Sequence, residues 1–261
     1  MNPRLARWLR PAADLGWLLL PFALVLLAYK LHQLWPAAWR GPVRIAEPRA
    51  WELAWFGLHD GTALVTPAAW WQPRTHPLLD AIAGVAYLIF VPAFIAMAAW
   101  WRFAPAPPAV RTARSPLAQR AMWALLLLYV AGYATYLAYP AAPPWYYDRY
   151  GAALVAAAPP DAAGTLRFDA LIGFPLFANY YGKSLNIFGA IPSLHCGTSL
   201  LALLYALRAR SWRLFAAAQL LAVTFGAVYL NHHYLVDAVV GFAYAAAAFA
   251  VLESRSLSRR G

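Results

Sequence analysis

The chain has 261 residues, of which 63% are apolar and 12% are charged, and its formal net charge is +11 at pH 7. Soluble globular domains have about 45–50% apolar and about 25% charged residues, so this composition excludes an ordinary soluble domain and indicates a polytopic membrane protein. The Lys and Arg residues lie between apolar segments and form no soluble basic face, which argues against a nucleic-acid partner. The single cysteine, Cys196, excludes an intramolecular disulfide.

Six apolar segments are long enough to cross a bilayer, which takes about 20 residues. In chain order they are residues 15–31, 78–101, 118–139, 191–207, 212–230 and 233–252. We therefore expect an all-α, polytopic integral membrane protein with six transmembrane helices. The first segment follows three arginines, as in a signal peptide, but no small-residue cleavage site follows it, so we interpret it as a retained anchor.

The basic residues predict the orientation of these spans. With the N-terminus in the cytoplasm, 13 of the 21 Lys and Arg residues fall on the inner side, and the other 8 are spread over the longer outer loops. An excess of Lys and Arg in short loops marks the cytoplasmic side. We therefore expect a multi-pass cell-membrane protein with both termini in the cytoplasm.

Two long segments fall on the outer side, at residues 31–77 and 140–190. The first contains an apolar, Trp-rich stretch that predicts an interfacial helix at residues 51–58, followed by a proline-broken loop. Loops of this length in a compact protein usually have a function. We expect them to cover a site and to select its substrate.

Two motifs place titratable residues at the outer ends of predicted spans, where such residues are costly unless they act. His233 and Asp237 stand four residues apart, so on a helix they share one face, and the carboxylate can fix the imidazole tautomer. His195 follows Pro192 and Ser193 at a helix start, where free N–H groups attract phosphate. One hairpin separates the motifs, so we expect a single phosphoryl-transfer site that needs no metal or cofactor.

Each motif also has a structural interpretation. A Ser-Leu-His sequence at a helix start is often an ordinary cap, and a His-x3-Asp pair is often a structural contact. His232 lies five residues before Asp237, off the shared face, and we expect it to be secondary to His233. Three further histidines are scattered in loop-like sequence and are interpreted as interfacial or structural: His32, His59 and His76.

These motifs resemble those of the type 2 phosphatidic acid phosphatase superfamily of membrane lipid phosphatases and phosphotransferases. The resemblance covers roughly residues 129–241 and is closest to the inositol phosphorylceramide synthase branch, through residues 139–146 (YPAAPPWY), 188–195 (FGAIPSLH) and 229–234 (YLNHHY). It implies the catalytic set His195, His233 and Asp237: His233 as the nucleophile that accepts the phosphoryl group, Asp237 as its orienting partner, and His195 as the acid and base. These roles coincide with those inferred from the residues.

The common phosphatases of this superfamily hold phosphate with a set of basic residues, the phosphate clamp, and this chain lacks those residues. Their Lys-x6-Arg-Pro element has no match, and Gly226-Ala227 stands where they have Ser-Arg. Other groups must therefore hold the phosphate, and our candidates are Ser193, Lys183, Arg149 and Arg167. A weaker clamp suits a phosphodiester, which carries less negative charge than a monoester.

The leading hypothesis is a membrane enzyme that moves a phospho-headgroup, such as phosphoinositol, from a phospholipid donor to a lipid alcohol through a phosphohistidine. The alternative is a lipid-phosphate phosphatase that acts on phosphatidic acid or a polyprenyl phosphate and uses water as the acceptor. The third hypothesis is a non-catalytic membrane protein or transporter.

We divide the chain into an N-terminal membrane region (1–117), a catalytic core (118–252) and a cytoplasmic tail (253–261), with the active site at the extracytoplasmic face. The acceptor lipid and the oligomeric state stay open.

Overall fold

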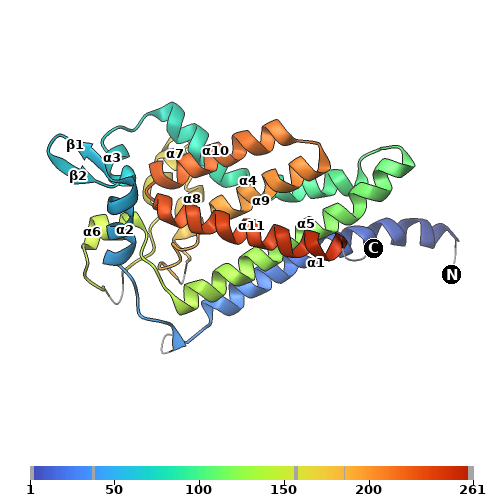
Figure 1. Ribbon diagram of the computed structural model, residues 1–261, viewed down its shortest axis with the longest axis horizontal. Helices are drawn as coiled ribbons and strands as arrows, with labels where there is room; N and C mark the ends of the chain where they lie inside the picture. Colours follow the sequence, from blue (N-terminus) through green and yellow to red (C-terminus); the bar gives the residue numbers. More distant parts are fainter. Residues whose placement is uncertain (1–2, 37–38, 156–157, 185, 258–261) are drawn as a thin grey trace.

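The computed structural model describes residues 3–36, 39–155, 158–184 and 186–257 (Figure 1). Six helices form a bundle and match the six predicted segments in order: α1 (Pro3–Gln33), α4 (Pro77–Phe103), α5 (Pro108–Ala138), α9 (Leu194–Ala209), α10 (Arg213–Tyr229) and α11 (Leu235–Leu257). α9 packs against α4, α5, α10 and α11, whereas α1 packs along α5. The apolar core lies around fully buried side chains of α5 and α9, among them Leu125, Leu128 and Leu201.

Four helices of the described chain are long and apolar enough to cross a membrane. They are residues Ala12–Gln33 of α1, all of α4 and α5, and Leu235–Ser254 of α11. α9 and α10 are apolar but have 16 and 17 residues. At 1.5 Å per residue these two helices extend about 24–26 Å, which is shorter than the roughly 30 Å hydrocarbon core. The expectation of a membrane protein is thus met by four helices, and six spans remain a prediction.

Both termini lie at one end of the bundle, and the short elements gather at the other (Figure 1). The segment between α1 and α4 forms α2 (Ala46–Phe56), a hairpin of β1 (Leu58–Asp60) and β2 (Ala63–Val65), and α3 (Pro67–Trp71). The segment between α5 and α9 forms α6 (Pro144–Tyr150), the 3-10 helix η2 (Ala163–Thr165), α7 (Leu166–Ile172) and α8 (Leu176–Tyr181). Short elements therefore cover this end, as the long loops predicted.

The segment between α1 and α4 differs from the sequence interpretation in two details. The interfacial helix begins earlier than predicted and ends at Phe56, and the segment expected to be a proline-broken loop contains two paired strands. Gly61 has a φ of +63° and provides the tight turn between them. The Arg74 guanidinium pairs with Asp60 at 2.7 Å and lies 4.2 Å from the centre of the Trp70 ring, which fastens the hairpin to α3.

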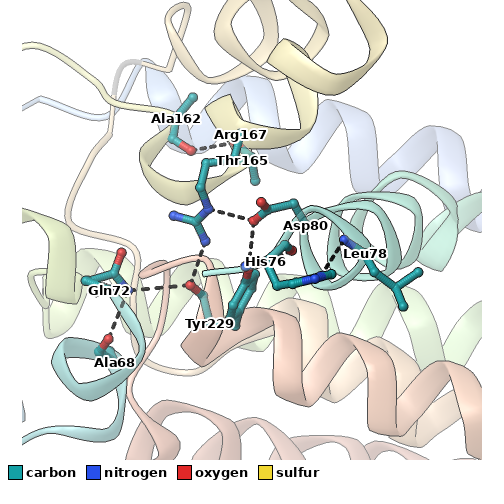
Figure 2. Close-up of polar contacts among 9 residues, drawn as sticks. All are labelled: Ala68, Gln72, His76, Leu78, Asp80, Ala162, Thr165, Arg167 and Tyr229. Atoms are coloured by element: carbon teal, nitrogen blue, oxygen red, sulfur yellow. Dashed lines mark hydrogen bonds and ion pairs between the residues drawn. The ribbon is translucent and has the colours of Figure 1, made fainter. Parts of the chain in front are cut away.

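A polar network joins the segment between α5 and α9 to the bundle (Figure 2). Arg167 in α7 donates to Asp80 of α4 at 2.6 Å and to the Tyr229 carbonyl at the end of α10 at 3.0 Å. The Tyr229 hydroxyl donates to the same Asp80 oxygen at 2.9 Å and accepts from the backbone N–H of His76. Because Asp80 is buried, its paired cation is needed to compensate the charge. The network therefore fixes α7 against α4 and α10.

Candidate active site

His195 is presented by the first turn of α9. Ser193 is the N-cap of this helix, and its hydroxyl accepts from the N–H of Cys196 at 3.3 Å. Pro192 therefore lies just before α9 rather than in its first turn. The His195 ring stacks on Tyr87, with 4.4 Å between ring centres, and Phe90 packs against it at 4.8 Å. These two α4 side chains restrict the orientation of the imidazole.

His233 and Asp237 do meet, but by a different route from the one predicted. α11 begins at Leu235, so His233 precedes the helix and the pair does not share a helical face. Asp237, in the first turn, reaches back: its Oδ2 accepts from the N–H of Tyr234 at 2.9 Å and lies 3.3 Å from His233 Nδ1. The carbonyl of Ala190 lies 3.1 Å from the same Nδ1.

The two histidines are in direct contact, and their partners define the positions of the protons. The Ala190 carbonyl can only accept, so His233 Nδ1 carries the proton and its Nε2 presents a lone pair. That Nε2 lies 3.2 Å from His195 Nδ1, which is then the donor. His195 Nε2 in turn accepts from the Tyr181 hydroxyl at 3.4 Å. The result is an oriented chain that ends on an unprotonated, nucleophilic His233 Nε2.

Tyr181 is a site residue that the sequence did not reveal. It ends α8, whose first N–H groups are capped by both carboxylate oxygens of Asp169, at 2.9 Å from the N–H of Phe177 and 2.8 Å from that of Ala178. No local motif marks it, because it is one of 15 tyrosines and reaches His195 only through the fold.

The starts of α9 and α11 are held together closely. The N–H of Ser193 donates to the Asp237 carbonyl at 2.9 Å. A Cβ added at Gly241 would lie 2.3 Å from the Ser193 carbonyl oxygen, so only glycine allows this approach. The contact keeps the two histidine-bearing segments in register.

Glu52 of α2 is a second residue that sequence analysis missed. It is fully buried, and its carboxylate accepts from the N–H groups of Leu235 at 2.9 Å and Val236 at 3.1 Å, where α11 begins. It thus caps the helix that carries Asp237. Burial raises the pKa of Glu52 to about 7, helped by the nearby Asp237 and opposed by the two N–H groups. An acidic residue between Trp51 and Trp55 in a short apolar helix was the available signal.

Both histidines line a cavity of about 210 Å³ at this end of the bundle. Its walls come from α1, α4, α5, α8 and the loop before α9, and they are rich in tyrosine, including Tyr29, Tyr129, Tyr133, Tyr136 and Tyr180. Among the described lining residues Asp161 is the only carboxylate, and none is Lys or Arg.

The structure does not bring the predicted cationic phosphate ligands to the histidines. Arg149 forms an ion pair with Asp161, and Arg167 is engaged by Asp80 and Tyr229. Lys183 is exposed. The Ser193 hydroxyl is used as a cap, which leaves the positive end of α9 as the nearest anion-attracting feature. Within the described residues, no group of His, Cys, Asp and Glu is arranged to hold a metal ion.

The remaining histidines have different positions. His232 donates from Nε2 to the Ala162 carbonyl at 3.0 Å and packs on Tyr181, so it supports the cavity wall. His76 caps α4 by accepting from the N–H of Leu78, as a structural residue does. His59 lies exposed on β1. His32, expected in a loop, is instead buried in the last turn of α1 and lines the cavity.

The sequence matches the family described as the PAP2 superfamily over residues 60–251. It is 31% identical over 256 residues to phosphoinositol dihydroceramide synthase of Bacteroides thetaiotaomicron, covering 96% of this chain and 81% of that protein. It is 28% identical to the inositol phosphorylceramide synthase catalytic subunit aur1 of Schizosaccharomyces pombe, covering 82% of this chain and 48% of the relative. Inositol phosphorylceramide synthase of Candida albicans is 29% identical, with 79% and 41% covered. The chain thus spans less than half of each fungal relative, and no solved structure matches it.

Proposed function

Since this chain belongs to the PAP2 superfamily, we propose that it transfers phosphoinositol from a membrane phospholipid to a lipid alcohol of the ceramide type. The chain is an enzyme of membrane-lipid metabolism, a lipid phosphotransferase or phosphatase. The observation that carries the proposal is the contact of His195 with His233 beside Asp237 in the wall of a cavity.

In the first step His233 Nε2 attacks the phosphorus of the donor phosphodiester. The bond from phosphorus to the diacylglycerol oxygen breaks, and His195 gives its Nδ1 proton to that oxygen. The phosphorylated imidazole is cationic, and Asp237 lies against its Nδ1–H. In the second step His195 Nδ1 takes the proton of the acceptor hydroxyl, and the oxygen attacks phosphorus. The bond from phosphorus to His233 Nε2 breaks, which returns neutral His233 and leaves His195 protonated on Nδ1 for the next cycle.

Substrate must separate the two histidines. Their facing nitrogens are 3.2 Å apart. An attacking nitrogen about 3–3.5 Å from phosphorus, with a leaving oxygen in hydrogen-bond reach of the acid, needs roughly 6 Å or more between the nitrogens. The phosphate therefore replaces the direct hydrogen bond, and the His195 ring moves along Tyr87 to accommodate it.

The charge of the site favours transfer over phosphate-monoester hydrolysis. A monoester carries about −1.5 to −2 charge at pH 7, whereas a phosphodiester carries a single charge. No Lys or Arg is found among the described residues that line the cavity. Two histidines and a helix N-terminus suit the smaller charge, and this supports a phosphodiester donor.

The test uses purified protein in liposomes that contain phosphatidylinositol or phosphatidic acid, each with and without ceramide or diacylglycerol. We expect a new phosphoinositol lipid, detected by mass spectrometry, that forms only with an acceptor and is lost in His233→Ala. His59→Ala is the matched control, because this exposed histidine lies on the hairpin. Inorganic phosphate from phosphatidic acid without any acceptor would instead identify a phosphatase.

We also propose that the histidine end of the bundle faces the extracytoplasmic side, with six crossings and both termini in the cytoplasm. The arginine distribution supports this orientation. Lys183 is exposed and lies in the chain between Tyr181 and Ser184, which line the cavity, and the native Cys196 is buried. A Lys183→Cys variant should therefore react with a membrane-impermeant maleimide added outside intact cells; labelling only after lysis would reverse the orientation.

A further inference from the structure

His32 is a buried polar residue in the cavity wall that the proposed phosphoryl transfer does not use. It lies in the last turn of α1, is 5% exposed, and lines the same cavity as His195 and His233. Its ring stacks on Tyr133, with 5.2 Å between ring centres and 19° between planes, and Tyr136 packs edge-on at 5.9 Å. The imidazole is therefore held in one orientation.

The neighbours of His32 determine which nitrogen carries its proton. The Asn186 Oδ1 accepts from the N–H of Phe188 at 3.1 Å, which orients the amide so that its Nδ2 faces His32 Nε2 at 3.1 Å. The amide nitrogen can only donate, so His32 Nε2 is the acceptor and the neutral ring has its proton on Nδ1. This Nδ1–H is buried and has no hydrogen-bond partner among the described residues.

An unpaired buried donor of this kind is destabilising, and a ligand oxygen that reached it from the cavity would relieve that cost. The charge of the cavity restricts which ligand fits. Its one described carboxylate, Asp161, is already paired with Arg149. A cationic amine headgroup would thus find no free anion and would meet an N–H donor, whereas a hydroxyl group can accept from that N–H.

We propose that His32, positioned by Asn186 and Tyr133, forms a headgroup subsite that takes an uncharged, hydroxyl-rich group such as a cyclic polyol. This inference rests on the proposed function, because it assigns the headgroup of the phospholipid donor to the α1 side of the cavity. The phosphate then lies at His233 and the polyol contacts His32. The donor is selected by this contact, separately from the chemistry at phosphorus.

Two substitutions of His32 separate the hydrogen bond from the shape of the ring. His32→Phe keeps an aromatic ring on Tyr133 and removes the donor, whereas His32→Asn restores an N–H donor near the position of Nδ1. One neutral hydrogen bond is worth about 0.5–1.5 kcal/mol, or roughly 2- to 12-fold in affinity. We expect His32→Phe to raise the KM for phosphatidylinositol by that factor with kcat little changed, and His32→Asn to retain most of the affinity.

Soluble headgroups test the same site without turnover. Glycerophosphoinositol and glycerophosphocholine are titrated into the detergent-solubilised wild type and both variants by calorimetry, with His59→Phe as the control. We expect glycerophosphoinositol to bind the wild type more tightly, and this preference to be lost only in His32→Phe. Equal affinity for the two probes, or an unchanged preference in His32→Phe, would overturn the proposal.

The outcomes also separate this inference from the function on which it rests. If the wild type transfers no headgroup from phosphatidylinositol, the proposed function fails, and the binding comparison still decides the subsite. If transfer occurs but neither KM nor binding responds to His32→Phe, the subsite alone is wrong. Elution volume and thermal midpoint confirm that each variant is folded.

Discussion

Asp237→Asn removes one charge from the site and changes little else. The asparagine oxygen can still accept from the N–H of Tyr234, where Asp237 Oδ2 now lies at 2.9 Å. The His233 tautomer should also survive, because the Ala190 carbonyl, 3.1 Å from Nδ1, holds that proton by itself. In the proposed mechanism, what is lost is the attraction between this carboxylate and the His233 imidazole, which becomes cationic when it takes the phosphoryl group.

The size of this loss follows from the geometry. The carboxylate oxygen and the ring nitrogen are 3.3 Å apart. Two unit charges about 4 Å apart interact by about 4 kcal/mol at an effective dielectric constant near 20. The imidazolium charge is shared with the more distant nitrogen, so we expect about 2–4 kcal/mol, which lowers kcat by roughly 30- to 1000-fold.

The assay compares initial rates of headgroup transfer by wild type, Asp237→Asn, His233→Ala and the surface control Asp60→Asn. We expect kcat to fall for Asp237→Asn with little change in KM, and His233→Ala to be inactive. A rate for Asp237→Asn within threefold of wild type would refute the electrostatic role. Complete inactivity, equal to that of His233→Ala, would show that Ala190 does not hold the tautomer.

Two further predictions concern stability. In Gly241→Ala the new Cβ meets the Ser193 carbonyl, and overpacking of this kind costs about 1–3 kcal/mol, so we expect a lower thermal midpoint. Gly16→Ala is the control: its Cβ meets nothing within 4 Å and alanine favours the helix, so its midpoint should stay the same or rise. A Gly241→Ala midpoint equal to that of wild type would contradict the close approach. Burial raises the pKa of Glu52 from 4.5 to about 7. Between these two pH values the folded protein keeps a proton on Glu52 that the unfolded chain releases, so the free energy of unfolding falls by about 3 kcal/mol as the pH rises from about 4.5 to 7. The thermal midpoint of wild type relative to Glu52→Gln should therefore decline from pH 5 to pH 7 and then level off; a constant difference would show that Glu52 does not titrate in this range.

The bundle could be predicted from the sequence because membrane-type helices are marked by continuous apolar runs. All six runs became helices in the expected order. The boundaries were less accurate: α1 begins at Pro3 and α5 at Pro108, because polar residues ahead of an apolar run can continue the same helix. The hairpin β1–β2 was missed since three-residue strands have too few positions to show an alternating pattern.

The contact between the two histidine motifs was predicted, whereas most of the residues that surround these motifs were not. The pairing of His195 with His233 followed from two motifs that were predicted to lie on the same side of the membrane. Tyr181, Glu52 and His32 reach the site from other elements, and such long-range contacts leave no periodic signal in the chain. The guanidinium of Arg167 was expected near phosphate, but only the fold places it against Asp80.

The wall of the cavity includes residues that lie outside the part of the chain that matches the PAP2 superfamily. The match to the PAP2 superfamily begins at residue 60, after α1 and α2, yet Tyr29, His32 and Gln33 of α1 form part of the cavity wall. A fragment restricted to the matched region would keep both reacting histidines and lose one side of the chamber they face. Exchange of the first 59 residues between related enzymes would therefore replace this wall of the cavity together with the Glu52 cap of α11, while His195 and His233 stay in the matched part of the chain. On the proposed function, the donor preference should follow the exchanged segment, whereas the reacting histidines stay the same.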